Sequence, residues 1–202
     1  LYDSAKQLFQ DTNVQITCHG QRHLGAAIGT RLFTEEYVSR KVKIWSDELL
    51  TLSSIAETHP HSAYCAFVHG VVPKWNYVMR TIKSVGSLFQ PLEDVIHRHF
   101  IPALIGRRDP CCQFERDLLS LPCRLGGLNI PIPTQLSDHQ FSASKQISAP
   151  LTSLIISQSK EFSIPSLQSI KYEIRQTKQQ LLNTQSDNIK TSSDPLLQRT
   201  ID

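Results

Sequence analysis

The amino-acid sequence predicts a mainly α-helical protein with a β-hairpin at its N-terminus. Apolar residues recur at helical spacing from about residue 34 onward, and the residues before them alternate or cluster at turn positions. Of the 202 residues, 40% are apolar and 19% are charged, which is typical of a globular domain with a substantial core. The formal net charge of +3 is mildly basic and identifies no partner by itself.

The N-terminal segment predicts a short helix over residues 1–11 and then the hairpin. Residues 14–18 alternate as a strand, residues 19–21 give a turn signal, and residues 22–28 read as a second strand. Gly25 and Gly29 indicate that another backbone or a ligand comes close. Because a lone hairpin is marginal in water, we expect it to complete a sheet that lies upstream of residue 1.

The clearest helical pattern lies between about residues 34 and 57. Its apolar residues are spaced 4, 3, 4, 3 and 4 apart, which places on one face Val38, Val42, Trp45, Leu49, Leu52 and Ala56. Thr34 is the predicted N-cap, and Glu35 and Glu36 suit the positive end of the helix dipole. Pro60 marks the end of the helix.

Further helices are predicted along the rest of the chain. Their approximate ranges are 61–71, 74–82, 87–105, 112–120, 134–148, 150–160 and 165–183. Pro73 should end or kink the first of them, and Pro150 should separate two of them. His99 falls on an apolar stripe and is predicted to be a core histidine. The Ser-, Thr-, Asn- and Gln-rich residues 184–202 should form a disordered tail.

The sequence contains no recognisable catalytic motif. Glycine-rich nucleotide loops and the serine-hydrolase elbow are both missing. The acidic pairs all fall in predicted helices, where adjacent residues point to different sides, so we expect ordinary surface charge at Glu35-Glu36, Asp47-Glu48, Glu93-Asp94, and Glu115 with Asp117. The paired histidines lack a further ligand at metal-binding spacing. No polar constellation indicates a small-molecule enzyme.

Cysteine usage and hydropathy bear on the compartment. The five cysteines are odd in number and irregular in spacing, which indicates reduced thiols in an intracellular protein of the nucleus or cytoplasm. No apolar run is long enough to predict a membrane span, so we expect no membrane partner.

Two basic segments are candidates for nucleic-acid contact. The first is a basic–aromatic cluster formed by Lys74, Trp75, Tyr77 and Arg80. Its rings could stack on a base while its cations pair with phosphate, unless the two aromatic residues instead fill the core after the nearby proline. The second segment lies on the polar side of the long helix and contains Arg40, Lys41 and Lys43. These cations either form a solvated face or follow a duplex backbone.

Three stretches together resemble the reverse transcriptases of non-LTR-type retrotransposons. Residues 20–29, GQRHLGAAIG, resemble the hairpin that follows the catalytic strands, where a Leu-Gly pair ends the palm. The long helix with Lys43-Ile44-Trp45, followed by residues 63–70 and 75–80, is similar to the helical thumb. Residues 121–130, LPCRLGGLNI, resemble the Pro-x-x-x-Gly-Gly-Leu-Gly-Ile signature beyond the thumb, with Asn129 in place of the usual glycine. The resemblance covers about residues 1–145.

The resemblance implies a division of the chain. Residues 1–32 would be the end of the palm with its hairpin, residues 33–110 the helical thumb, and residues 111–183 a C-terminal helical connection region, ahead of the tail at 184–202. The hairpin around Arg22, His23 and Gly25 would be the primer grip. Both basic segments would face an RNA–DNA or DNA duplex.

The resemblance also implies what this chain lacks. The strand with the Tyr/Phe-x-Asp-Asp motif, the Mg²⁺ that it holds, and the rest of the fingers and palm would lie upstream in the same polyprotein. This chain would therefore bind no cofactor of its own and would not be catalytic alone. The alternative is a helical protein-interaction module with no nucleic-acid role.

Overall fold

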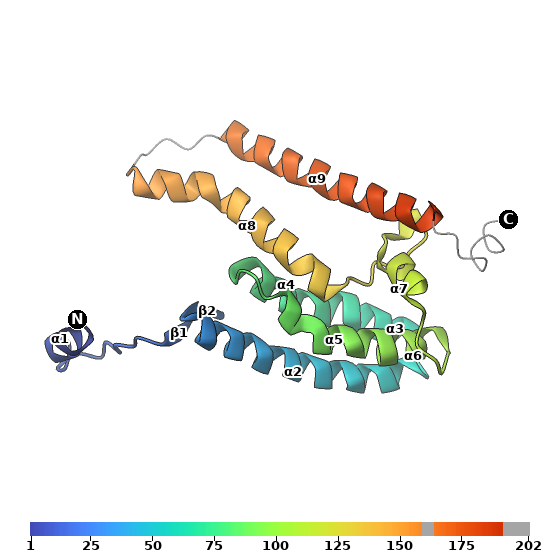
Figure 1. The fold of residues 1–202 in the computed structure, drawn as a ribbon, viewed down its shortest axis with the longest axis horizontal. Coiled ribbons are helices and arrows are strands. Elements are labelled where there is room, and N and C mark those ends of the chain that lie inside the picture. Colours follow the sequence, from blue (N-terminus) through green and yellow to red (C-terminus); the bar gives the residue numbers. More distant parts are fainter. Residues whose placement is uncertain (159–163, 192–202) are drawn as a thin grey trace.

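The computed structural model describes residues 1–158 and 164–191, and it confirms the predicted fold class. A two-stranded antiparallel hairpin is followed by a helical bundle. In Figure 1, α2 (Arg31–Ala56) runs along one side of the bundle, and most of the helical segments between residues 60 and 105 pack against it. The first helix, α1 (Tyr2–Leu8), lies apart from the bundle and buries none of its side chains.

An N-terminal hairpin forms as predicted, but its strands and its turn lie later in the chain than the alternation of residues 14–28 indicated. The strands are β1 (Gly20–His23) and β2 (Ala26–Gly29), and residues 14–18 belong to neither. The turn consists of Leu24 and Gly25, with φ angles of 48° and 84°. Two successive positive φ angles match the twist that a two-residue hairpin loop requires. A Leu-Gly turn is easily missed, because leucine is not a usual turn residue.

The long helix confirms its predicted stripe and begins earlier than predicted. Thr30, not Thr34, is the N-cap, because its side chain accepts a hydrogen bond from the Phe33 amide at 3.3 Å. The Thr34 hydroxyl donates instead to the carbonyl of Arg31 at 2.8 Å. The apolar stripe faces the core, and its fully buried members include Val38 and Leu49.

Two prolines widen helices instead of ending them. The segment from residue 60 to 81 is helical throughout, as α3 (Pro60–Ala66), a π-helical turn (Phe67–Val71) and α4 (Val72–Thr81). A second such run contains a 3₁₀ turn (Gly86–Phe89), α5 (Gln90–Val95), a π-helical turn (Ile96–Phe100) and α6 (Ile101–Ile105). Each π-helical turn ends two residues before a proline, Pro73 or Pro102. The missing proline N–H leaves a carbonyl unpaired, and the wider turn accommodates the break.

The π-helical turns determine which residues reach the core. The rings of Phe67 and Phe100 stack with centroids 4.6 Å apart. The prediction that His99 is a core residue was wrong, because the buried positions of this segment include Ile96 and Phe100, and His99 is exposed. The neighbouring His97 is half-buried, and its Nε2 lies 2.6 Å from the carbonyl oxygen of Cys111.

The C-terminal third is more helical than predicted. It contains α7 (Gln113–Ser120), α8 (Pro133–Ile156) and α9 (Ile164–Thr191). Pro150 lies inside α8 and does not divide it, which corrects the predicted break. The predicted tail was also wrong for residues 184–191, which continue α9 and bury Ser186 and Ile189. Residues 192–202, the rest of that predicted tail, lie outside the described residues. Figure 1 shows α9 running back alongside α8.

One acidic residue that was predicted to be surface charge is buried. Glu93 is 9% exposed and forms a two-pronged ion pair with Arg116 of α7, at 2.6 Å and 2.8 Å. Arg116 also donates to the carbonyls of Ile130 and Pro131, at 3.0 Å and 2.8 Å. This single side chain therefore joins α5, α7 and the end of the loop that leads into α8.

Candidate nucleic-acid interface

Two tyrosines fix the hairpin turn to the helical bundle. The Tyr77 hydroxyl of α4 donates to the Leu24 carbonyl oxygen, and the Tyr37 hydroxyl of α2 donates to the Gly25 carbonyl oxygen, each at 2.6 Å. A Cβ atom at position 25 would lie 3.4 Å from the Tyr77 ring, and the φ of 84° there favours glycine. Gly25 thus permits both the turn and its contact with α4.

Helical spacing places several cations around these two tyrosines. Arg40 and Lys41 follow Tyr37 by three and four residues, so they lie beside it on α2. Lys74 and Arg80 lie three residues before and after Tyr77 on α4. We call the set the hairpin-tip surface, and its residues are Arg22, His23, Leu24, Gly25, Tyr37, Arg40, Lys41, Lys74, Tyr77 and Arg80.

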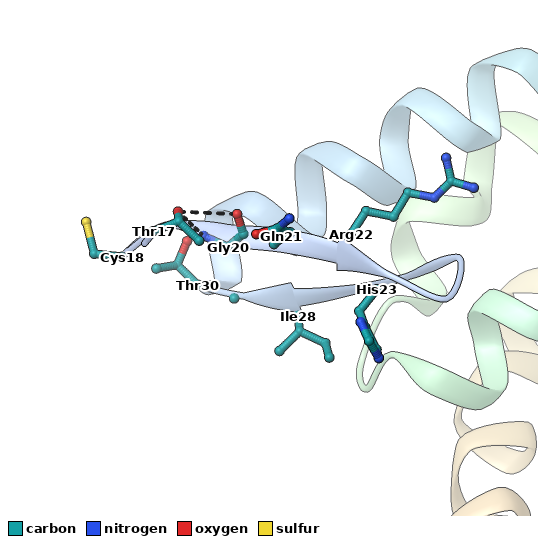
Figure 2. Close-up of a pocket in the computed structure, with 9 residues that line it drawn as sticks. Thr17, Cys18, Gly20, Gln21, Arg22, His23, Ile28 and Thr30 are labelled. Atoms are coloured by element: carbon teal, nitrogen blue, oxygen red, sulfur yellow. Dashed lines mark hydrogen bonds between the residues drawn. The ribbon is translucent and has the colours of Figure 1, made fainter. Parts of the chain in front are cut away.

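The strand alternation divides the hairpin's own candidates between two faces. Figure 2 shows the Arg22 side chain leaving the hairpin on the side opposite to His23 and Ile28. Arg22 pairs with the buried Ala27 across the strands, so it shares the face that turns toward the bundle. His23 and Ile28 flank the open hollow along the hairpin and are exposed to solvent. Arg22 is therefore better placed than His23 to act together with the helix cations.

Lys74 carries an ion pair that moderates its charge. Its Nζ lies 2.6 Å from Oε2 of Glu48 on α2, and the two side chains are 45% and 41% exposed. Exposed pairs of this kind contribute only about 0–1 kcal/mol. The pair joins α4 to α2, and it is weak enough for Lys74 to exchange its carboxylate for another anion.

Two predicted candidates do not reach this surface. Trp75 is fully buried and packs edge-to-face on Phe67, with centroids 5.9 Å apart, so it cannot stack on a base. Lys43 is exposed but lies six residues beyond Tyr37, roughly 120° around the helix. The alternative interpretation of Trp75 as a core residue is the one that the structure confirms.

Tyr37 is a residue of this surface that the sequence analysis missed. It is 7% exposed and contributes to the core, and its hydroxyl binds the hairpin turn. A tyrosine near a predicted apolar stripe is usually assigned to the core, and the sequence holds no signal that its hydroxyl would bind a turn twelve residues earlier.

In the glycine-rich loop after α7, residues 121–130, the backbone conformation explains why glycine and asparagine stand where they do. A Cβ atom on Gly127 would lie 2.0 Å from the carbonyl oxygen of Leu121. Gly126 has a φ of 85°, and Asn129 has a φ of 54°. Glycine adopts positive φ freely, and asparagine tolerates the left-handed region better than most residues. The substitution of asparagine for glycine at position 129 is therefore compatible with the loop.

The described part of the chain shows neither a metal centre nor a membrane-spanning helix. Within residues 1–158 and 164–191, no three His, Cys, Asp or Glu side chains are grouped so as to hold a metal ion. The helices described there include none with the length and hydropathy needed to cross a bilayer. The chain matches no protein-family model, no curated protein and no solved structure.

Proposed function

We propose that this chain is the C-terminal thumb portion of a retrotransposon RNA-directed DNA polymerase, and that its hairpin-tip surface contacts the RNA–DNA primer–template duplex. The observation that carries the proposal is the pair of tyrosine hydrogen bonds to the hairpin turn. They hold Arg22 of the hairpin and the cations of two helices as one surface. Lysine and arginine side chains on a fixed surface are what a phosphate backbone requires.

The loop of residues 121–130 is compatible with the proposal. Its resemblance to the retrotransposon signature had one departure, Asn129, and the positive φ at that position is one that asparagine tolerates. The departure therefore does not weigh against the resemblance.

The proposal assigns the chemistry to other parts of a polyprotein. The fingers and palm would supply the catalytic aspartates and bind Mg²⁺. This chain would bind the duplex and take no part in the chemical step. The place of action would be intracellular, in the nucleus or the cytoplasm. The hairpin would continue the palm sheet.

The test is the binding of a fluorescent RNA–DNA hybrid, measured by anisotropy over a range of salt concentrations. We expect the logarithm of the affinity to fall linearly with the logarithm of the salt concentration, by about 0.9 for each phosphate neutralised. Replacing Lys74 and Arg80 by alanine should weaken binding and reduce this slope by up to about 2.

The matched control removes the same charge elsewhere. Lys171 and Lys178 are exposed cations of α9, and their replacement by alanine should change hybrid binding less. Equal losses from the two double variants would reject the hairpin-tip surface as the binding site. Hybrid binding that is absent at low salt would reject the duplex role and favour a protein-interaction module.

A further inference from the structure

The helix α8 extends beyond the bundle without a fully buried residue in its projecting part. Its buried residues, Pro133 and Ser137, both lie in its first two turns, where it packs on α4. From Asp138 to the end of the helix, every residue is half-buried or exposed. Figure 1 shows this part of α8 projecting from the bundle with α9 alongside it.

One apolar stripe of α8 packs against α9. Ala143, Ile147, Pro150 and Leu154 of α8 are half-buried, and they recur at spacings of four and three. The apolar residues of α9 that are half-buried in the same way include Leu167, Ile170 and Ile174 in its first half. Because α8 and α9 are in contact, we infer that these two stripes face each other.

A second stripe lies about a third of a turn further round α8. Its members are spaced 3, 4, 3 and 4 apart, the spacing of a helix–helix seam, and they are Phe141, Ser144, Ser148, Leu151 and Ile155. Leu151 is 52% exposed and Ile155 is 59% exposed. Among the residues that the structure describes, no element covers the outer half of this stripe.

The stripe is complementary to itself when two copies run antiparallel. If Ser148 meets its own counterpart on a two-fold axis, then Ser144 faces Leu151 and Phe141 faces Ile155. Each pairing on either side of the axis sets a larger side chain against a smaller one, which lets the surfaces interdigitate. A two-fold axis produces each such contact twice.

The charge of α8 also fits a second copy. Between residues 139 and 156 the helix carries one formal charge, Lys145. Depletion of charged residues is typical of the centre of a protein interface. Two such faces meet without opposing like charges, whereas a nucleic acid would require more cations than α8 offers.

The available area sets the expected strength. The projecting part of α8 is about 27 Å long, at roughly 1.5 Å per residue. We call the projecting part of α8, together with α9 beside it, the arm. It is roughly 20 Å wide and offers about 500 Å² of surface per copy. The total of about 1,000 Å² is at the lower limit for a specific interface, so the association should be weak and reversible.

We propose that the second stripe of α8 is a two-fold interface through which two copies of this chain associate. The inference does not depend on the proposed nucleic-acid role. Sedimentation velocity of the full chain, from low micromolar to near-millimolar concentration, should show a reversible monomer–dimer equilibrium. A chain that stays monomeric across this range would overturn the proposal.

Charge placed on the stripe identifies the interface. The double variant Leu151→Glu and Ile155→Glu should abolish the dimer, whereas Ser142→Glu with Ala149→Glu adds the same charge to exposed positions on the other side of α8 and should leave it intact. A dimer that persists in the first variant, or is lost equally in both, would overturn the assignment.

A more conservative variant tests the interface if the introduced glutamates unfold α8. Leu151→Ala retains or improves helix propensity. It should weaken the dimer by about tenfold or more while leaving the circular dichroism spectrum unchanged, because two-fold symmetry removes the apolar leucine side chain from the interface twice. An unchanged dimerisation constant in this variant would also overturn the proposal.

Discussion

The buried pair of Arg116 and Glu93 should be a major determinant of stability in this fold. The arginine side chain is 1% exposed and the glutamate side chain is 11% exposed. Arg116 donates two hydrogen bonds to the carboxylate of Glu93 and one to each of two loop carbonyls. We therefore choose Arg116→Met, which keeps much of the side-chain volume and removes every donor.

The magnitude follows from what the substitution leaves unpaired. Removing one partner of a buried ion pair costs about 3–5 kcal/mol, because the other charge stays buried without compensation. The carbonyls of Ile130 and Pro131 lose a charged donor as well. Glu93→Gln should cost less, roughly 2 kcal/mol, because Arg116 retains the two carbonyls and one amide oxygen as acceptors.

Urea denaturation followed by circular dichroism measures these losses in the free energy of unfolding. Adding Glu93→Leu to Arg116→Met should recover part of the loss, because no isolated charge remains, but the two loop carbonyls still lack a donor. The matched control is Arg107→Met. Arg107 pairs with Glu115 at 2.6 Å on the surface, with side chains 54% and 33% exposed, so this change should cost at most about 1 kcal/mol. A cost below about 1 kcal/mol for Arg116→Met would refute the reasoning.

Two further predictions concern the hairpin and α7. Tyr37→Phe and Tyr77→Phe each remove one hydrogen bond to the hairpin turn, worth about 1 kcal/mol, so amide hydrogen exchange across residues 20–29 should accelerate, most in the double variant. For α7, the hydrogen bond from Arg107 lowers the pKa of Glu115, and the Cys112 amide adds to this effect. The Glu115 contribution to stability should therefore be present above the usual glutamate pKa of about 4.3 and be lost as pH falls through the lower, folded value.

For each of these two predictions, a second variant distinguishes the proposed interaction from a general loss of stability. Tyr172→Phe removes a hydroxyl from a side chain that is 62% exposed on α9, and it should leave exchange in the hairpin unchanged. If the hairpin exchanged equally fast in Tyr172→Phe, the tyrosine hydrogen bonds would not be what holds it. Glu115→Gln should flatten the acid limb of the stability profile, and an unaltered limb would assign that limb to other carboxylates.

Local periodicity explains which elements could be predicted from the sequence. The stripe of α2 was predicted correctly because the side chains of one helix repeat along it whatever lies opposite. Pro150 was taken for a break, but α8 continues through it, although proline has no N–H to bond the Gln146 carbonyl. Gln146 is exposed, so water can replace the missing donor at that position. A proline in the sequence does not reveal whether the carbonyl it leaves unpaired faces solvent.

Pairings between distant residues could not be predicted in this way. Glu93 and Arg116 are 23 residues apart. The local sequence around each of them does not indicate that it is buried. The same holds for Tyr77 and Leu24, which are 53 residues apart. Candidate cations on the helices were found from two basic segments of the sequence, but the role of Tyr37 and Tyr77 in arranging them depends on the folded chain.

The helix α4 connects the two proposed surfaces and also keeps them separate. Its exposed side presents Lys74, Tyr77 and Arg80 around the hairpin turn, and it packs on α8. The 3₁₀ turn that follows α4 also packs on α8, where a Cβ atom at Gly86 would lie 2.8 Å from the Thr134 carbonyl oxygen. The Arg116 hydrogen bonds hold the loop that leads into α8, so the direction of the projecting arm is set from the bundle. The second stripe of α8 begins at Phe141, one turn after the buried Ser137. Duplex binding at the hairpin and pairing of two arms thus use different residues, and either proposal can fail without the other.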